Sequence, residues 1–460
     1  MTSSFVEEPS SFRDPSGFLF YHDRTIFRQV NQSYKEDYDH LISSGLYKEL
    51  TATNLLLEHE DVDFVPPKPE LCYKIIKPKK IDFITYPYEW SFSQLKDAAL
   101  ITLEIQKKAM NHGMTLKDAT AYNIQFNHGK PIFVDTLSFE KYKEGQIWKP
   151  YKQFCQHFLA PLALMSYQDI RFNQLFKIFI DGIPLDITSK LLPFSTKTSF
   201  SLMSHIHLHA KSQKHYEDKS IKKEAKMGKN AFIGIIDNLH SSVKKMDWSP
   251  KGTEWADYYS DTNYTDKAFE EKKKIILQFL DAIKPENVWD LGGNVGIFSR
   301  LASGRGIQTI SFDIDPAAVE KNYLELKKND EKHILPLVLD LTNPSPGIGW
   351  ENTERKSLID RGPTDTAFAL ALIHHLAISN NLPFDKIANF FRMICTNLVI
   401  EFVPKSDSQV QRLLSTREDI FNEYTEEQFK RVFNKYFTIR DEVNLMDSER
   451  KLFRMEKLIA

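Results

Sequence analysis

The stretch Val288-Trp-Asp-Leu-Gly-Gly-Asn-Val-Gly-Ile-Phe-Ser-Arg300 decides the fold of the carboxy-terminal half of the chain. It opens with a short apolar run, as in a buried strand. The run is then broken by residues that tolerate unusual backbone angles, namely Gly292, Gly293, Asn294 and Gly296. Apolar residues resume at helical spacing from Ile297. A strand, a glycine turn and a helix in this order let backbone N–H groups approach a ligand at the helix amino terminus.

A second acid, further along the chain, indicates the kind of ligand. The stretch Gln308–Asp313 is predicted to be the next strand, and it ends on Asp313. An acid at the end of the second strand is where a nucleotide ribose is usually held. Together with the glycine turn, Asp290 and Asp313 predict a site for a nucleoside cofactor.

The spacing of the glycines distinguishes between cofactors. The dinucleotide pattern Gly-x-Gly-x-x-Gly fits poorly, because from Gly292 its later glycines fall on Asn294 and Ile297. The pattern Asp/Glu-x-Gly-x-Gly-x-Gly fits better, with Asp290, Gly292 and Gly296 in place and Asn294 at the middle glycine. This resembles motif I of the class I S-adenosylmethionine (SAM)-dependent methyltransferases, where asparagine, which tolerates a left-handed backbone, is a familiar variant. A structural turn in another α/β protein is the competing interpretation.

The resemblance implies a binding role for each acid. SAM carries no phosphate, so the glycine loop is expected to close on the methionine and ribose portions instead. Asp290 is expected to order this loop and to face the cofactor's amino group, and Asp313 to hold the ribose hydroxyls. Asp340, after the predicted strand Leu335–Leu339, resembles the acid that accepts the adenine amino group. A helix cap or a loop contact is the alternative role for each of these acids.

The elements around these residues predict a doubly wound α/β domain. Predicted strands at Asn287–Leu291, Gln308–Asp313, Leu335–Leu339, Asp365–Leu372 and Asn397–Phe402 are separated by helices, which implies right-handed crossovers onto a parallel sheet. No helix separates Phe437–Glu442 from Lys451–Lys457, so these form a predicted hairpin and the final strand is antiparallel. The arrangement resembles the Rossmann-like, seven-stranded sheet of class I methyltransferases over residues 255–460.

Two histidines are the candidate catalytic residues. His374 and His375 follow the predicted strand that starts near Asp365, and in many methyltransferase families this strand end faces the methyl acceptor. Methyl transfer is an in-line displacement in which positioning supplies most of the rate. A base is needed when the acceptor is a hydroxyl or a charged amine, and histidine suits that task near pH 7. A packed histidine at a strand end is the rival interpretation.

Charged residues further on are open to two interpretations. Glu401 and Asp407, around the end of the fifth strand, either bind a cationic acceptor or start the next helix. Arg450 and Lys451 precede the last strand, and their pattern is that of a surface pair.

The amino-terminal half contains a separate polar segment. Asp118, Asn123 and Asp135, spread over two predicted short strands, resemble the catalytic segment of protein-kinase-like and aminoglycoside-phosphotransferase-like folds, where such residues handle the acceptor hydroxyl and hold magnesium. The sequence departs from that pattern: no histidine precedes Asp118 as expected, Asp135 is followed by Thr-Leu, and no glycine-rich loop lies upstream. The alternative is a polar hairpin whose acids cap turns.

No metal site is predicted. The three cysteines, Cys72, Cys155 and Cys395, are widely spaced and suit a reducing compartment. The alternating His205, His207 and His209, followed by His215, would share one face of a strand, but no acid or thiol completes a zinc set, and such stretches are usually solvated.

Composition sets the remaining expectations. The formal net charge of −2 over 460 residues provides no overall attraction for nucleic acid or an anionic membrane. No segment has the features of a secretory signal or a transmembrane helix, so a cytoplasmic protein is expected. We predict an α+β domain over 1–200, a linker over 201–254 and the methyltransferase-like domain over 255–460.

Three functions are compatible with these features. The first is a SAM-dependent methyltransferase that acts on an unidentified, small-molecule acceptor recruited or shaped by the amino-terminal domain. The second is a SAM-binding regulator without turnover. The third is a bifunctional protein in which Asp118, Asn123 and Asp135 bind Mg-ATP.

Overall fold

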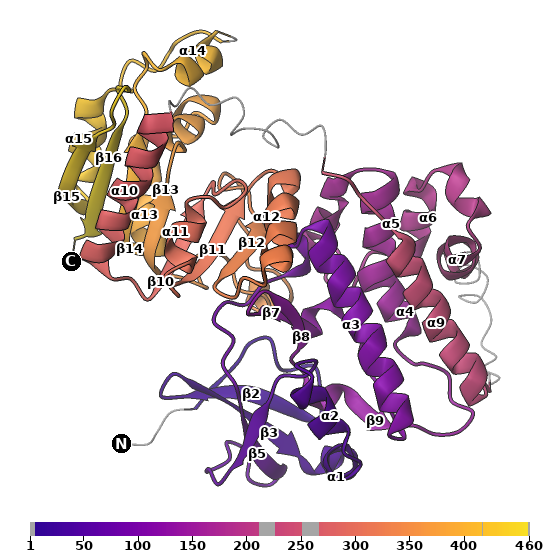
Figure 1. Ribbon diagram of the computed structural model, residues 1–460. Coiled ribbons are helices and arrows are strands. Elements are labelled where there is room, and N and C mark those ends of the chain that lie inside the picture. Colours follow the sequence, from indigo (N-terminus) through magenta and orange to yellow (C-terminus); the bar gives the residue numbers. More distant parts are fainter. Residues whose placement is uncertain (1–4, 211–225, 251–265, 416, 459–460) are drawn as a thin grey trace. The chain divides into compact units, whose positions relative to one another are not determined.

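The chain divides into two compact units. The computed structural model describes residues 5–210, 226–250, 266–415 and 417–458 (Figure 1). Unit 1 comprises Met1–Ser249 and Gly347–Arg355, and unit 2 comprises Pro250–Pro346 and Lys356–Ala460. Much of the interval interpreted from sequence as a linker therefore belongs to unit 1, because α9 (Lys229–Lys245) packs against α3 (Phe92–Asn111). The excursion Gly347–Arg355 back to unit 1 has no counterpart in the sequence prediction.

Unit 1 begins with an antiparallel sheet of five strands in the order β1-β2-β3-β5-β4. The strands are β1 (Val6–Glu7), β2 (Gly17–His22), β3 (Thr25–Asn31), β4 (His59–Val62) and β5 (Cys72–Pro78). β2 and β3 are antiparallel and form a hairpin. Between β3 and β4 the chain forms η1 (Gln32–Tyr34), α1 (Lys35–Ser43) and α2 (Leu46–Ala52). Gly45, which adopts a φ of 84°, separates α1 from α2.

The helix α3 starts at a capping box formed by Ser91 and Gln94. The Ser91 backbone N–H donates to the Gln94 side chain, and apolar residues along one face of the helix are buried. Beyond it, β6 (Met114–Leu116) pairs with β9 (Phe139–Lys141), and β7 (Ile124–Asn127) pairs with β8 (Lys130–Phe133). Short 3₁₀ turns accompany them: η2 (Pro87–Glu89), η3 (Ala121–Asn123) and η4 (Thr136–Ser138).

The rest of unit 1 is helical and buries several aromatic side chains, among them Phe154, Phe158 and Phe176. Its elements are α4 (Tyr151–Phe154), η5 (Cys155–Leu159), α5 (Ala160–Tyr167), η6 (Ile170–Lys177), α6 (Leu185–Leu191), η7 (Phe194–Thr198), α7 (Phe200–Leu202), η8 (Met203–Leu208) and α9. His205 and His207 lie in a helical turn rather than a strand. Both are buried and hydrogen-bonded: His205 to Tyr151 and Asn238, and His207 to Ser189 and Thr196. His215 lies outside the described residues.

Unit 2 is built on a sheet of seven strands in the order β12-β11-β10-β13-β14-β16-β15. The strands are β10 (Asn287–Leu291), β11 (Gln308–Asp313), β12 (Ile334–Val338), β13 (Thr364–Ala369), β14 (Cys395–Phe402), β15 (Phe437–Asn444) and β16 (Lys451–Lys457). The first five are parallel, and β16 runs antiparallel to both β14 and β15. The final hairpin is thus present where the sequence placed it.

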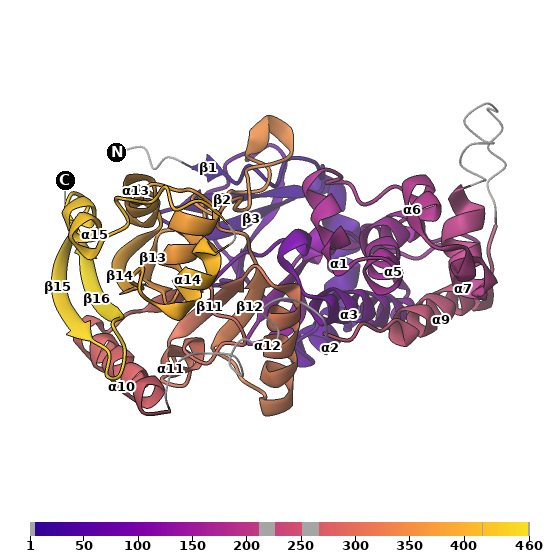
Figure 2. The same cartoon turned by 90° about the horizontal axis from the view of Figure 1, so that it is seen from above.

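Helices cover both faces of this sheet. They are α10 (Asp266–Ile283), α11 (Ser299–Ser303), α12 (Pro316–Asn329), η11 (His375–Ser379), α13 (Phe384–Ile394), α14 (Ser408–Leu414) and α15 (Glu426–Phe433). The short turn η10 (Trp350–Asn352) lies in the excursion assigned to unit 1. Figure 2 shows α10 and α11 on one side of the sheet and α13 on the other. Within the described residues, no helix is both long and apolar enough to cross a bilayer. Because β10 to β14 are parallel, the loops after them meet at one edge of the sheet.

Candidate functional site: a pocket at the carboxyl ends of the strands of unit 2

A cavity of about 450 Å³ lies where the parallel strands of unit 2 end. This volume is in the range of small-molecule sites, which is on the order of 300–1,000 Å³. Its lining includes the residues just after β10, β11, β12 and β13, together with side chains from α10, η11 and α14. Ligands of open α/β sheets bind at this edge, next to the point where the strand order reverses. Here the reversal falls at β10, which lies between β11 and β13.

The glycine loop after β10 has the backbone conformation that its sequence predicts. Gly292 and Gly296 both have a φ of 82°, and Asn294 has a φ of 49°. Asn294 is thus a non-glycine residue in the left-handed region, which asparagine tolerates best. At Gly293 a Cβ atom would lie 2.5 Å from the Ser311 hydroxyl oxygen and 3.0 Å from a carboxylate oxygen of Asp290, so any larger residue would displace the loop.

Asp290 is the acid of β10, and its side chain is almost completely buried. Its carboxylate accepts a hydrogen bond of 2.6 Å from the Ser299 hydroxyl at the start of α11. Burial raises the pKa of Asp290 to about 6, although Ser299 and the charge of Lys272 act in the opposite direction. The carboxylate both ties the loop to α11 and lines the cavity.

Asp313 ends β11 and holds two loops in place. One carboxylate oxygen accepts from the Asn294 N–H and the other from the Asp315 N–H, each at 2.8 Å. Burial raises the pKa of Asp313 to about 6, and the two backbone donors lower it in part. A carboxylate has about four acceptor positions, so these two bonds leave capacity for the pair of hydroxyls of a ribose. Asp315 itself caps α12 by accepting from the Ala317 N–H at 2.8 Å, with Pro316 at the first helical position.

Asp340 follows β12 and lies at the rim of the cavity. It accepts hydrogen bonds from the backbone N–H and the hydroxyl of Thr342, at 2.8 and 2.7 Å. It is partly exposed and lines the cavity together with Leu339 and Leu341.

The two candidate histidines lie in different environments. His375 lines the cavity, whereas His374 is only 1% exposed, is absent from the lining, and has an Nδ1 atom with no hydrogen-bond partner among the described residues. Burial lowers the pKa of His375 to about 4, with a further contribution from the nearby charge of Arg450. Burial likewise lowers the pKa of His374 well below its usual value. Both imidazoles are therefore neutral at pH 7.

The structure thus brings most of the candidate residues together at one cavity. Its lining includes Asp290, Gly292, Gly293, Asn294, Asp313, Asp340 and His375. Gly296 and His374 are the candidates that do not line it. Gly296 faces away from the cavity, because a Cβ atom there would lie 2.5 Å from the Asn322 side-chain nitrogen. Its role in the structure is to let the loop pack closely against α12.

Glu401 and Asp407 belong to a buried group of charges beside the cavity, and the sequence interpretation missed its two cations, Lys272 and Arg450. Lys272 of α10 lines the cavity, is 1% exposed, and donates to Glu401 Oε2 at 2.6 Å. Arg450 is also 1% exposed; it lies 3.7 Å from Glu401 Oε1 and donates twice to Asp407, at 2.7 and 3.0 Å. The interpretation of Arg450 as a surface residue was therefore wrong. Asp407 additionally caps α14 through the Gln409 N–H, which was one of its two predicted roles.

The polar segment of unit 1 is organised differently. Asp135 forms an ion pair with Arg28 of β3, and the exposed fractions of the two side chains are 16% and 10%. Burial alone would raise the pKa of Asp135, but Arg28 and hydrogen bonds from Ser138 and the Leu137 N–H lower it overall. The pKa of Asp118 is raised by burial and by the charge of Asp135. Among the described residues, no group of three His, Cys, Asp or Glu side chains is placed to hold a metal ion.

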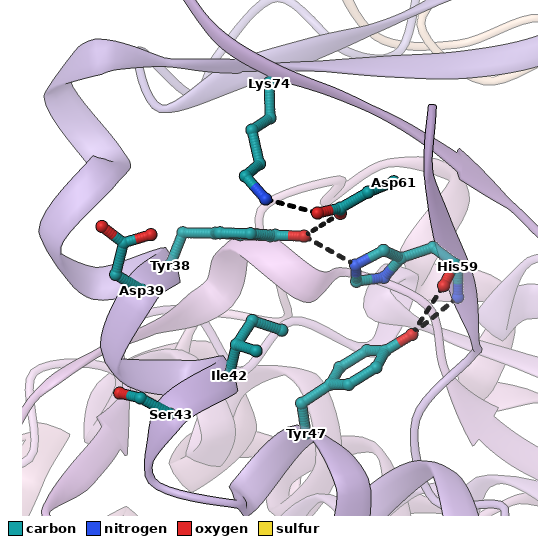
Figure 3. A pocket seen from close by; sticks show the side chains of 8 residues that line it. All are labelled: Tyr38, Asp39, Ile42, Ser43, Tyr47, His59, Asp61 and Lys74. Carbon is teal, nitrogen blue, oxygen red and sulfur yellow. Dashed lines mark hydrogen bonds and ion pairs between the residues drawn. The ribbon is translucent and has the colours of Figure 1, made fainter. Parts of the chain in front are cut away.

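Unit 1 has a second, more open cavity, of about 510 Å³, between α1, α2, β4 and β5 (Figure 3). The Tyr38 hydroxyl donates to Asp61 at 2.7 Å and lies 3.0 Å from His59 Nε2, and Lys74 pairs with Asp61. The Tyr47 hydroxyl is hydrogen-bonded to the backbone of His59. The polar groups in Figure 3 are thus bonded mainly to one another, which is the arrangement of a structural network.

Comparison of the sequence with known proteins identifies its family. No protein-family model matches the chain. The nodulation protein NoeA of Rhizobium meliloti (strain 1021) is 34% identical over 462 residues, which span 97% of this chain and 95% of NoeA. The chain therefore belongs to the same family as NoeA.

Solved structures similar to part of the chain include methyltransferases. Magnesium protoporphyrin IX methyltransferase of Synechocystis PCC 6803, with bound S-adenosylhomocysteine (SAH), is 14% identical, with a TM-score of 0.32 over 44% of this chain and 93% of that one. N-methyltransferase NodS of Bradyrhizobium japonicum WM9 is 14% identical, with a TM-score of 0.32 over 42% and 98%. WbdD is 13% identical, with a TM-score of 0.30 over 44% and 42%.

Proposed function

We propose that the chain is a SAM-dependent methyltransferase that transfers a methyl group to a small-molecule acceptor. The observation that carries the proposal is the pocket of unit 2, where acids at the ends of three neighbouring parallel strands, β10, β11 and β12, surround a cavity beside the loop bent at Gly292 and Asn294. The antiparallel last strand and the motif around Asp290 agree with the resemblance to class I methyltransferases.

The charge of the pocket suits SAM better than a phosphate-bearing nucleotide. The charged side chains of the lining are Asp290, Asp313, Asp340 and Lys272. Three acids and one base complement SAM, which at pH 7 carries a sulfonium, an ammonium and a carboxylate group. The same acids would repel the phosphates of a dinucleotide. The charged groups of the lining therefore support SAM, the cofactor that the glycine spacing predicts.

Each pocket acid is matched with a part of the cofactor. Asp313, held by two backbone N–H groups, would accept from the ribose hydroxyls, and Asp340 at the rim would accept from the adenine amino group. Asp290 would face the ammonium group and keep the loop in place through Ser299. Gly293 leaves the room beside Asp290 that this arrangement needs.

The remaining lining residues would position the acceptor. Bound SAM supplies a methyl group on a positively charged sulfur, and a lone pair of the acceptor displaces it in line. Leu370, Leu372, Leu376 and Leu413 give the cavity apolar walls, which exclude water around the reacting atoms. His375 is neutral at pH 7, so we assign it the role of accepting a hydrogen bond from the acceptor's O–H or N–H group; with its pKa lowered to about 4 it is a weak base. The ring of His374 lies 4.1 Å, centroid to centroid, from that of His375 and would hold it in position.

We assign unit 1 the task of recruiting or shaping the acceptor. A kinase-like arrangement is supported by its five-stranded sheet, by the helices between β3 and β4, and by the hairpin β7–β8 between Asn123 and Asp135. Magnesium binding is disfavoured, because the carboxylate that would hold the metal is paired with the guanidinium of Arg28. We therefore place the bifunctional alternative below the methyltransferase.

Transfer of label from methyl-labelled SAM to cell metabolites, catalysed by the full chain, tests this proposal. We expect label to appear in a discrete small molecule, and to be lost when Asp290→Asn is used in place of the wild type. If the wild-type chain binds SAH but labels no component, a SAM-binding regulator without turnover is the better description. If it neither binds SAH nor transfers label, the proposal is wrong.

A further inference from the structure

A short segment of unit 1, residues 190–200, exposes large apolar side chains that the proposed function does not use. Phe194 of η7 is 77% exposed, Phe200 of α7 is 76% exposed, and Leu191 at the end of α6 is 38% exposed. Figures 1 and 2 both show α6 and α7 at the same end of unit 1. Single apolar residues on a surface need no explanation, but several gathered in one segment indicate a surface that is covered in use.

The backbone of this segment is fixed from the inside of the unit. Thr196 is buried, and its hydroxyl donates to the Pro193 carbonyl at 2.7 Å and lies 2.9 Å from His207 Nε2. The other ring nitrogen of His207 is 2.8 Å from the Ser189 hydroxyl, so one buried imidazole ties α6 and η7 to η8. Leu192 is buried as well. The two phenylalanines are therefore held outward by an ordered framework.

The charge of this part of the chain is positive. Residues 187–210 contain no Asp or Glu, although the whole chain has 62 acids in 460 residues. Both lysines of this stretch, Lys190 and Lys197, are exposed. The Lys197 ammonium lies 4.9 Å from the centre of the Phe194 ring, so charge and apolar surface are presented together. Lys190 is 3.8 Å from Asp186, an exposed pair of the kind that contributes little.

An anionic lipid surface complements both properties of the segment. Phenylalanine and leucine side chains enter the boundary between headgroups and acyl chains, and lysines beside them are attracted to the lipid phosphates. A second copy of the chain fits less well. Two copies related by a twofold axis place the same segment on both sides of the contact, so Lys190 and Lys197 would face lysines.

We propose that residues 190–200 of unit 1 bind the surface of an anionic lipid bilayer, with Phe194 and Phe200 inserted at the level of the headgroups and Lys190 and Lys197 against the lipid phosphates. The contact is interfacial, and with two aromatic anchors and two charges it is weak and reversible. The inference is independent of the proposed function, because it concerns a surface of unit 1 and not the pocket of unit 2.

Co-sedimentation of the full chain with lipid vesicles tests the proposal. One set of vesicles contains phosphatidylcholine alone, and the other contains equal amounts of phosphatidylcholine and phosphatidylglycerol. We expect the chain to bind the anionic vesicles about 10-fold or more tightly than the neutral ones, because two lysines face the lipid phosphates. Raising the salt concentration from about 0.1 M to about 1 M should remove most of this preference, since it shortens the Debye length from about 10 Å to about 3 Å.

Two double variants separate the apolar contribution from the electrostatic one. Phe194→Ser with Phe200→Ser should weaken binding to anionic vesicles by about 10-fold or more. Lys190→Gln with Lys197→Gln should weaken it by a similar factor and abolish its salt dependence. The thermal unfolding midpoint of both variants should equal that of the wild type, because the replaced side chains are exposed.

Matched controls carry the same kinds of substitution elsewhere on the surface. Val65→Ser with Ile420→Ser removes two apolar side chains that are 70% and 63% exposed. Lys332→Gln with Lys386→Gln removes two exposed lysines of unit 2. Both controls should bind anionic vesicles within about 2-fold of the wild type.

Three results would overturn the inference. The first is a wild-type chain that sediments with neither kind of vesicle. The second is vesicle binding that both double variants retain in full, which would assign it to another surface. The third is self-association of the wild type in analytical ultracentrifugation that Phe194→Ser with Phe200→Ser abolishes, without binding to vesicles. In that case the segment joins two copies of the chain.

Discussion

The acids of unit 2 and those of unit 1 follow a similar sequence pattern but have different surroundings. Asp313 ends a strand, its oxygens are held by backbone N–H groups, and among the described residues no cation pairs with it. Asp135 also follows a short strand, but it is paired with the buried guanidinium of Arg28. The first arrangement leaves a negative charge for a ligand, whereas the second uses the charge within the fold. The counter-charge thus distinguishes a binding acid from a structural one.

Removing the structural acid should have the largest effect, and on stability. Asp135→Ala leaves Arg28 buried and unpaired, so the free energy of unfolding should fall by about 3–5 kcal/mol. SAH affinity should not change. Denaturant unfolding and SAH titration of the same preparation measure both quantities. If instead Mg-ATP stabilises the wild type in thermal unfolding and Asp135→Ala abolishes the shift, the acid binds a nucleotide and the comparison is broken.

Removing the binding acid should chiefly affect the ligand. Asp313→Ala should weaken SAH binding by about 1–3 kcal/mol, because a carboxylate that receives the ribose hydroxyls is lost. Calorimetry measures the change. Asp365→Ala is a matched control: Asp365 is the second residue of β13, near the amino end of that strand and away from the loop edge, and accepts from the Glu286 N–H. An equal loss of affinity in both variants would indicate a general disturbance of the sheet.

The pH dependence of the acids of unit 2 should be a smaller effect. Burial raises the pKa values of Asp290 and Asp313 from 3.8 to about 6 in the folded state. Their contribution to stability is therefore fully present below pH 3.8 and is lost as the pH rises through about 6. The ligand requires the ionised carboxylates, so SAH affinity should decrease as the pH falls below about 6. Titrations between pH 5 and pH 8 check this, and an affinity independent of pH would contradict it.

The smallest effect is expected at the rim. Asp340 is partly exposed and bonds to Thr342, so Asp340→Ala should weaken SAH binding by about 0.5–1.5 kcal/mol, the range of one ordinary hydrogen bond. Titration with SAH and with its inosine analogue, which lacks the adenine amino group, sharpens the assignment. The variant should lose affinity for SAH and not for the analogue.

The strands and acids of unit 2 were predictable because their signals are local. Asn287–Leu291, Gln308–Asp313 and Lys451–Lys457 are apolar or alternating runs bounded by turn residues, and the structure has strands at these bounds. The left-handed conformation of Asn294 follows from its place among glycines. Asp290, Asp313 and Asp340 come together because parallel strands share one edge.

The remaining parts of the site depend on contacts between distant segments. Lys272 stands in a run of three lysines, and only the packing of α10 decides that it is buried while Lys274 is exposed. Arg450 has the pattern of a surface residue and is buried by Glu401 and Asp407, which lie far from it in sequence. His374 and His375 are neighbours, and the turn into η11 places only the second at the cavity.

The most direct test of the central claim is calorimetric titration of the full-length chain with SAH. The account predicts saturable binding with one site per chain, lost or strongly weakened in Asp313→Ala and retained in Asp135→Ala. Absence of binding by a folded wild-type chain, or binding that depends on Asp135 and not on Asp313, would contradict it.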